Sequence, residues 1–226
     1  MMGRSAVLLA TPLQVASRLF GLLSEQGFVS RVLFSLARIA LGFGAAFAAG
    51  ILLASLAAIS QIAEAFIRPY MTVAKTVPVA SFIVLALIWL SSSTLSVFIS
   101  FLMVLPIIYT NTLEGIRSAD TKLLEAAKIF RVPLARRVLY IRLPAAAPYV
   151  ISGSKIGLGM AWKAGVAAEV IAIAGGSVGE QLYFSKVYLD SAELLAWTLV
   201  VVLLSLAFEK LFLLLLNTAF KGVRKL

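Results

Sequence analysis

Four charged side chains interrupt long apolar runs of this sequence, and their surroundings limit what chemistry they can do. Arg38, Lys155, Lys163 and Glu169 all lie in stretches that are otherwise apolar. A charge that faces lipid costs roughly 2.5–3.5 kcal/mol on insertion scales, so each of these groups must meet protein or water. We therefore expect them to mark either ion pairs within the protein or a hydrated path through a membrane.

Two of these charges, Lys155 and Lys163, share one predicted helix that is rich in glycine. Eight positions separate them, which places them on nearly the same helix face, about two turns apart. If that face lines water, the two ammonium groups would favour the passage of an anion. The alternative is that the lysines pair with carboxylates such as Glu169, or extend toward an interface. Trp162 lies beside them and belongs to the same candidate pathway, although packing is its commoner role.

The composition excludes several classes of function. The sequence contains no cysteine and no histidine, so the commonest metal ligands and nucleophiles are missing. It has no GxxxxGK[ST] phosphate-binding loop, so we expect no catalytic residue, no cofactor and no ATP hydrolysis by this chain. The net charge is +10, but the basic residues lie mainly between apolar runs, as the positive-inside bias predicts for cytoplasmic loops. We therefore expect no nucleic-acid partner.

A long charged segment, 113–144, stands out among the connections between apolar runs. It contains seven basic and three acidic residues. LLEAAKIF consists of strong helix formers, and VPLARRVLYI predicts a second helix with Pro133 in its first turn. A helix pair with apolar residues on one side is suited to contact another protein. A solvated loop that merely joins two spans is the alternative.

The string EAAKIFRVPLARRVLYIRLP resembles the EAA loop of the permease subunits of ATP-binding-cassette (ABC) importers. Six residues match the pattern of that loop at the correct spacing: Glu125, Ala126, Ala127, Ile141, Leu143 and Pro144. The one departure is Arg131, which stands where the family has glycine at the turn between two short helices. Glycine suits such a turn because it tolerates positive φ. We expect this chain to make the turn without glycine and to restart its helix at Pro133.

The resemblance extends from near Arg31 to the C-terminus and is closest to the nitrate, sulfonate and taurine branch of these permeases. The stretches SLARIALGF, TVPVASFIVLALIWL and LPAAAPYVISGSKIGLGMAWKAGVAAEVIA carry it. Members usually have an additional first span, which we expect to be reduced here to an N-terminal segment. The resemblance implies the type I ABC importer permease fold and a small anion or small organic solute as substrate.

The resemblance also implies partners. Two permease subunits, here expected to be identical copies, form a pathway between them, and their EAA helices dock on two cytoplasmic ATPases. A separate extracytoplasmic binding protein selects the solute. Glu125 is then a contact with the ATPase, or else simply a first-turn acid that the helix dipole favours. A non-transporting membrane anchor or sensor that docks an ATPase is the alternative function, and we find no internal repeat of the kind typical of secondary transporters.

These residues must be positioned by membrane-spanning helices, each of which needs about 20 mostly apolar residues. We predict an all-α membrane protein with about five such helices. The second is expected to begin as early as Pro69 and to kink at Pro78, and it forms a tight hairpin with the third. The expected spans are 32–57, 77–92, 94–112, 146–173 and 194–216. Residues 1–30 form an N-terminal segment, and residues 31–226 form the permease domain.

The distribution of charge predicts the orientation. The basic segment 113–144 is expected in the cytoplasm and the acidic segment 174–193 outside, which places the N-terminus outside. The chain is then a multi-pass protein of a bacterial or archaeal inner membrane, in contact with lipid. This orientation leaves Arg4, Arg18 and Arg31 on the outer side, against the bias. We expect an amphipathic helix over 12–24 to lie in the outer interface, with one apolar face made of Leu13, Ala16, Leu19, Phe20 and Leu23.

Overall fold

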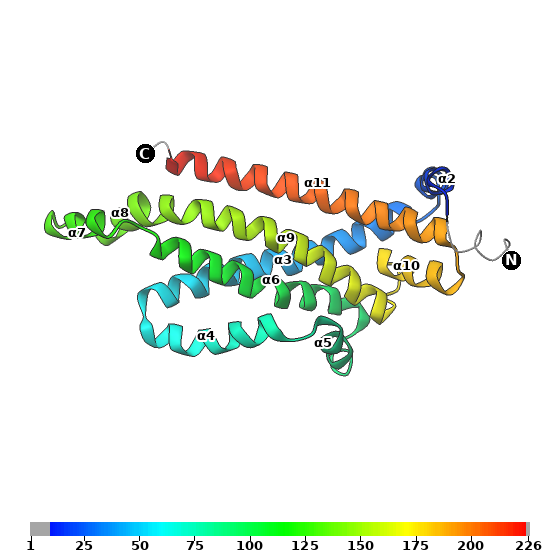
Figure 1. Ribbon diagram of the computed structural model, residues 1–226, viewed down its shortest axis with the longest axis horizontal. Coiled ribbons are helices and arrows are strands. Elements are labelled where there is room, and N and C mark those ends of the chain that lie inside the picture. The colour runs from blue at the N-terminus through cyan, green and yellow to red at the C-terminus, as the bar shows by residue number, and fades with distance from the viewer. Residues whose placement is uncertain (1–9, 225–226) are drawn as a thin grey trace. The chain divides into compact units, whose positions relative to one another are not determined.

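The structure, a computed structural model, describes residues 10–224, and within them every regular element is a helix (Figure 1). The all-α prediction is therefore confirmed for these residues. The helices are α2 (Pro12–Leu23), α3 (Phe28–Ile59), α4 (Gln61–Thr76), α5 (Val79–Ala86), α6 (Ser92–Arg117), α7 (Thr121–Ile129), α8 (Leu134–Arg137), the π-helix η1 (Val138–Arg142), α9 (Leu143–Ala172), α10 (Val178–Val187) and α11 (Ser191–Arg224).

Three helices of the described chain are long and apolar enough to cross a membrane by themselves. They are α3 with 32 residues, α6 with 26 and α11 over Ser191–Lys221. At about 1.5 Å per residue each exceeds the roughly 30 Å of a hydrocarbon core. The predicted spans 32–57, 94–112 and 194–216 are confirmed as apolar helices of that length. Only 6% of the apolar window of α11 is buried, so most of this helix is open to lipid or to another protein.

The expected span 77–92 is wrong as a single helix. α5 has eight residues, which is about 12 Å and too short to cross a membrane. α4 and α5 pass the test for a span only as a pair, and the pair is bent by 102°. The break falls where the sequence predicted a kink, at Pro78, because proline has no N–H to donate and its ring forces the preceding Val77 out of helical geometry, to φ −66° and ψ 127°. The helix before the break begins at Gln61, earlier than the expected Pro69.

α9 has 30 residues and covers the expected span 146–173 apart from its last position. It is long enough to cross a membrane, but it is not among the helices apolar enough to pass the same test. Lys155, Lys163 and Glu169 lower its hydropathy. A fifth span at α9 therefore stays a prediction. If α9 crosses the membrane, protein or water must surround its three charged side chains.

The chain folds as two compact units, and the long helices α3, α6, α9 and α11 each contribute to both. The first unit comprises residues up to 42, 78–100 and 161–207, and its core includes Leu22, Val178 and Trp197. The second comprises 43–77, 101–160 and 208–226. A core cluster of the second unit is built on Met71 and Tyr109. The second unit contains the charged segment 113–144.

The predicted amphipathic helix over 12–24 is confirmed as α2, whose Thr11 and Gln14 form a capping box. That its apolar face lies in the membrane interface stays a prediction, and the opposite side of α2 packs against the start of α11. Val15 and Leu22 are buried next to Trp197. Of the five residues assigned to one face, Leu13, Phe20 and Leu23 are exposed, whereas Ala16 and Leu19 are half-buried.

The basic residues on the predicted outer side have acidic partners. Arg18 Nη2 lies 2.9 Å from Glu25 Oε1 and 3.1 Å from Glu193 Oε2. Arg31 Nη1 lies 3.9 Å from Glu25 Oε2. Both arginines are therefore paired within the described chain, but the positive-inside bias counts Lys and Arg and is not relieved by these pairs. Arg4 lies outside the described residues.

Candidate functional site

The segment 113–144 contains a helical hairpin that follows the end of α6. α7 begins after Asp120, whose carboxylate accepts a hydrogen bond of 2.8 Å from the Lys122 N–H and so caps the helix. α8 returns the chain from Leu134. Figure 1 shows α7 and α8 at the far left, past the ends of α6 and α9. The predicted helix pair is therefore present, and we call residues 121–137 the coupling hairpin.

The turn of the coupling hairpin is built on Arg131. Its φ of 52° places it in the left-handed conformation that glycine adopts most easily. The Arg131 N–H donates to the Lys128 carbonyl at 3.0 Å, and the Val132 N–H donates to the Ala127 carbonyl at 2.9 Å. These two bonds form a Schellman motif, the usual C-terminal cap of a helix. The arginine thus takes the backbone geometry of the glycine that it replaces.

The second helix of the hairpin is continuous with the next long helix. Pro133 precedes α8 as its N-cap residue, so the expectation that it lies in the first turn is wrong by one position. α8, η1 and α9 follow without a break, and in η1 the Leu143 N–H bonds to the Val138 carbonyl five residues earlier. Because Pro144 cannot donate to the usual carbonyl, a widened π turn accommodates it. Ile141 lies in η1, and Leu143 and Pro144 open α9.

Glu125 does not lie in the first turn of its helix. α7 starts at Thr121 and has no acidic residue in its first turn, so a role through the helix dipole is wrong. Glu125 is exposed, and it forms no salt bridge with another described residue. Ala126 is half-buried and Ala127 is buried beneath the turn. The two alanines therefore close the hairpin, whereas the carboxylate remains open to a partner.

The tip of the hairpin exposes large apolar side chains. Phe130, next to the turn, is 80% exposed, and Ile129 and Leu134 on either side are also exposed. Basic side chains surround them, including the exposed Arg131 and Arg136. An apolar group of this size within a charged segment is typical of a surface that binds another protein, not of a solvated connection.

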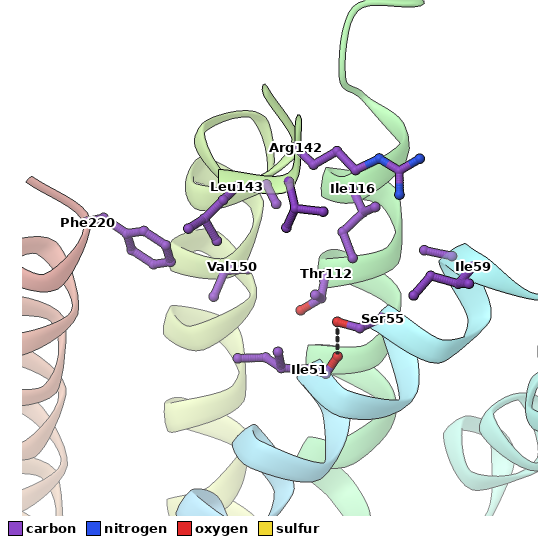
Figure 2. A pocket seen from close by; sticks show the side chains of 12 residues that line it. Ile51, Ser55, Ile59, Thr112, Ile116, Arg142, Leu143, Val150 and Phe220 are labelled. Atoms are coloured by element: carbon purple, nitrogen blue, oxygen red, sulfur yellow. Dashed lines mark hydrogen bonds between the residues drawn. The ribbon is translucent and has the colours of Figure 1, made fainter. Parts of the chain in front are cut away.

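A cavity of about 180 Å³ lies where η1 and the start of α9 approach α3 and α6. Figure 2 shows its lining, in which Arg142 and Leu143 come from the hairpin side and Ser55 and Thr112 from the two long helices. The Ser55 hydroxyl donates to the Ile51 carbonyl of its own helix at 2.8 Å. Since the lining is mostly apolar, few polar contacts hold this end of α9 against its neighbours.

Lys155 and Lys163 are both exposed, and Gly159 lies between them with nothing within 4 Å of where a Cβ would stand. No salt bridge joins either ammonium to a described residue. We call Lys155, Gly159 and Lys163 the lysine strip. Trp162 is 2% exposed and so lies on the packed side of α9, apart from the strip.

Glu169 is fully buried and connects three helices, so it does not pair with Lys163. Its Oε2 accepts hydrogen bonds from the Ser35 hydroxyl at 2.7 Å and from the Gly179 N–H at 3.3 Å. The Ser35 Oγ in turn accepts from the Val178 N–H at 2.9 Å. Sequence reasoning missed Ser35. The sequence does hold one signal for Ser35: it lies three residues before the charged Arg38, and so on the same face of the predicted helix.

Comparison with known proteins gives a family. Residues 46–225 match the family described as "Binding-protein-dependent transport system inner membrane component". The taurine transport system permease protein of Escherichia coli K12 is 27% identical over 211 residues, which cover 91% of this chain and 76% of the relative. The nitrate import permease protein of Synechococcus elongatus is 30% identical over 154 residues, covering 68% of this chain and 55% of the relative.

A candidate aliphatic sulfonates transport permease protein of Bacillus subtilis is 29% identical over 174 residues, covering 76% of this chain and 63% of the relative. The chain thus spans less than two thirds of the length of this relative. A solved structure, described as an amino acid ABC transporter with histidines, aligns with a TM-score of 0.67 and 16% identity over 93% of this chain and 100% of that chain. This likeness confirms the predicted importer permease fold.

Proposed function

The chain belongs to the family of inner-membrane components of binding-protein-dependent transport systems, and we propose that it is the permease subunit of an ATP-driven importer. In this proposal two copies form the solute pathway, and two cytoplasmic ATPase subunits bind the coupling hairpins. An extracytoplasmic binding protein delivers the solute. The host membrane is the cytoplasmic membrane of a bacterium or archaeon.

The observation that carries this proposal is the exposed apolar tip of the coupling hairpin. Phe130 is 80% exposed, yet it follows a helix that is capped at both ends and has a buried alanine beneath its turn. A rigid helical hairpin that presents apolar side chains to water gains free energy when a partner covers them. Glu125 adds a charge to the same hairpin, and the cationic rim gives the contact a preferred orientation.

The lysine strip supports a pathway on α9. Lys155 and Lys163 lie on a helix long enough to cross the membrane, and no carboxylate of the described chain pairs with either. Two unpaired ammonium groups at membrane depth require water or a second protein copy. A second copy facing the strip across a hydrated gap satisfies this requirement, and it leaves a positive lining along the gap.

The solute is proposed to be a small anion or a small organic solute of the nitrate, sulfonate or taurine type. The relatives are named for taurine, nitrate and aliphatic sulfonates, and each of these carries an oxyanion group. The positive lining of the strip favours the same chemical group. A non-transporting anchor or sensor is the competing function, but an anchor has no use for unpaired charges at membrane depth.

A pull-down of the ATPase subunit by the purified full chain tests the proposed contact. We expect Phe130→Asp to reduce capture at least about tenfold, because a charge would replace an apolar anchor of the interface. Tyr188→Asp is the matched control, since Tyr188 is 76% exposed but lies after α10, on the predicted outer side. Equal capture by both variants would contradict the proposal.

A further inference from the structure

α4 has two chemically opposite faces. Ile62, Phe66, Tyr70 and Val73 are exposed and follow one another at helical spacing, so they form one apolar stripe. Glu64, Arg68, Thr72 and Lys75 follow one another at similar spacing on the other side of the helix. The apolar stripe suits lipid. The polar face needs water or polar protein groups.

The polar face of α4 lies along the second half of α6. Lys75 Nζ donates to the Thr110 Oγ1 at 2.7 Å, and Arg117 forms a salt bridge with Glu64. Between these two links is a cavity of about 350 Å³. Eleven residues separate Glu64 from Lys75, which is roughly 16 Å along a helix. The cavity therefore forms a polar groove between α4 and the C-terminal part of α6, the helix that precedes the coupling hairpin.

A buried hydroxyl lines this groove and has no hydrogen-bond partner in the described chain. Tyr109 is 4% exposed, and its hydroxyl group makes no such bond. A buried hydroxyl without a partner is destabilising, so such groups are usually satisfied by a ligand or by water. The Tyr109 hydroxyl is thus an unsatisfied donor on a residue that lines the groove.

The charges of the groove are unbalanced in favour of cations. Arg68, Lys75 and Arg117 line it together with Glu64 and Glu114. Glu64 is already bound to Arg117. No carboxylate of the described chain forms a salt bridge with Arg68 or Lys75. Arg68, Lys75 and the phenol hydroxyl are all donors, and the Lys75 ammonium has further donors besides the one that bonds Thr110, so together they match an acceptor with several oxygens.

From this geometry we propose that the groove between α4 and α6 binds a small oxyanion through Arg68, Lys75 and the Tyr109 hydroxyl. This inference rests on the proposed function in one respect, the role of the bound anion. In that role the groove holds the solute near the cytoplasmic end of its path. Binding of the anion to the groove requires neither the ATPase nor the extracytoplasmic binding protein. A failure to bind would therefore leave the proposed ATPase docking untouched.

Binding of ethanesulfonate to the full chain tests this inference. The purified chain is placed in nanodiscs of phosphatidylcholine alone, and the dissociation constant is measured by calorimetry at fixed ionic strength. We expect Arg68→Gln and Lys75→Gln each to weaken binding about tenfold, as removal of a charge-assisted hydrogen bond does. Lys186→Gln is the matched control, since Lys186 is an exposed lysine of α10. It should bind as the wild type does.

Tyr109→Phe separates a ligand role from a structural one. It removes the unpartnered hydroxyl, so without ethanesulfonate the variant should melt at the same temperature as the wild type or higher, and yet it should bind the anion more weakly. Undiminished binding by all three groove variants, or an equal loss in Lys186→Gln, would overturn the inference. A lipid phosphate has the same chemistry. If phosphatidylglycerol nanodiscs raise the melting temperature through Arg68 and Lys75 and ethanesulfonate does not compete, the groove is a headgroup site and the solute assignment is wrong.

Discussion

Arg131 occupies the left-handed position at which the coupling hairpin turns, and its backbone conformation there is unfavourable for a residue with a side chain. A residue with a Cβ in this conformation costs roughly 1–2 kcal/mol relative to its preferred geometry. Two backbone hydrogen bonds fix the position, so the cost is not relieved by a local change of φ. The side chain is therefore expected to contribute something that glycine cannot, such as a contact with a carboxylate of the ATPase.

We predict that Arg131→Gly stabilises the isolated chain by up to about 1 kcal/mol, because glycine adopts positive φ without the Cβ penalty. Thermal unfolding of the purified variant and of the wild type measures this gain in stability. Leu189, which also has positive φ, supplies a control in Leu189→Gly, which should stabilise by a similar amount. A pull-down of the ATPase then tells whether the arginine contacts it. Weaker capture with higher stability supports a contact, and lower stability would contradict the turn geometry.

Glu125→Lys should leave folding and membrane insertion intact while it weakens ATPase binding by at least about tenfold, as expected when an exposed interface charge is reversed. Glu125 makes no salt bridge within the described chain, so its replacement removes no intramolecular pair. Capture of the ATPase and the melting temperature are both measured. Lys122→Glu, a charge reversal near the start of the same helix, is the comparison. Wild-type capture by Glu125→Lys would exclude this residue from the interface.

Residue identities alone predicted the hairpin because Glu125, the two alanines and the Ile-x-Leu-Pro end stand at fixed spacing. They did not predict how Arg131 would turn the chain, because sequence gives the preferred φ of a residue but not the hydrogen bonds that can override it. Nor did they identify Ser35, since a serine in an apolar helix usually bonds to its own backbone.

At the scale of the helices, α9 carries both a structural charge and two free ones. Glu169 is bonded to Ser35 and to the backbone of α10, whereas Lys155 and Lys163 extend from the exposed side. Sequence periodicity placed all three on one helix but left their partners open, because the partner depends on how other helices pack. The break at Pro78 was predictable from proline geometry. The angle between the two helices was not, because proline fixes its own φ and restricts the preceding residue but does not set the direction of the next helix.

Ser35→Ala should destabilise the chain by about 1–3 kcal/mol, because both the Glu169 carboxylate and the Val178 N–H would lose a buried partner. Ser154→Ala is a close control. Ser154 is also a buried serine, but its hydroxyl donates only to the Val150 carbonyl of its own helix, so its loss should cost little. Thermal unfolding in detergent compares the two variants. An equal loss of stability in the two variants would mean that the hydrogen bonds around Glu169 contribute no more than an intrahelical serine bond.

Lys163→Met should insert and fold normally and melt near the wild-type temperature, since no ion pair is lost. Uptake of an anionic solute should fall roughly tenfold, as removal of one cation from a low-dielectric path raises the barrier by about 1.4 kcal/mol. Lys186→Met serves as the control outside the span. If Lys163→Met instead melts lower and Glu169→Gln restores it, the two residues form a structural pair and the anion argument fails.

At the scale of the whole molecule, we propose that a hairpin that binds an ATPase is joined to a polar route through the membrane. The hairpin is continuous with α9 through η1, and α9 carries the lysine strip. Movement of the hairpin by an ATPase would therefore act on α9, the helix that we propose to line the solute path. The match over residues 46–225 shows the family, and the aligned structure shows the fold.

ATP-dependent uptake into vesicles tests this account most directly. The full chain is reconstituted with its ATPase subunit, and radiolabelled solute is supplied with the extracytoplasmic binding protein of the same importer. The account predicts that the wild-type chain accumulates the solute only with ATP, and that Phe130→Asp abolishes accumulation although the variant inserts normally. Uptake that persists in Phe130→Asp, or a wild-type complex that hydrolyses ATP with solute and binding protein present and moves nothing, would contradict it.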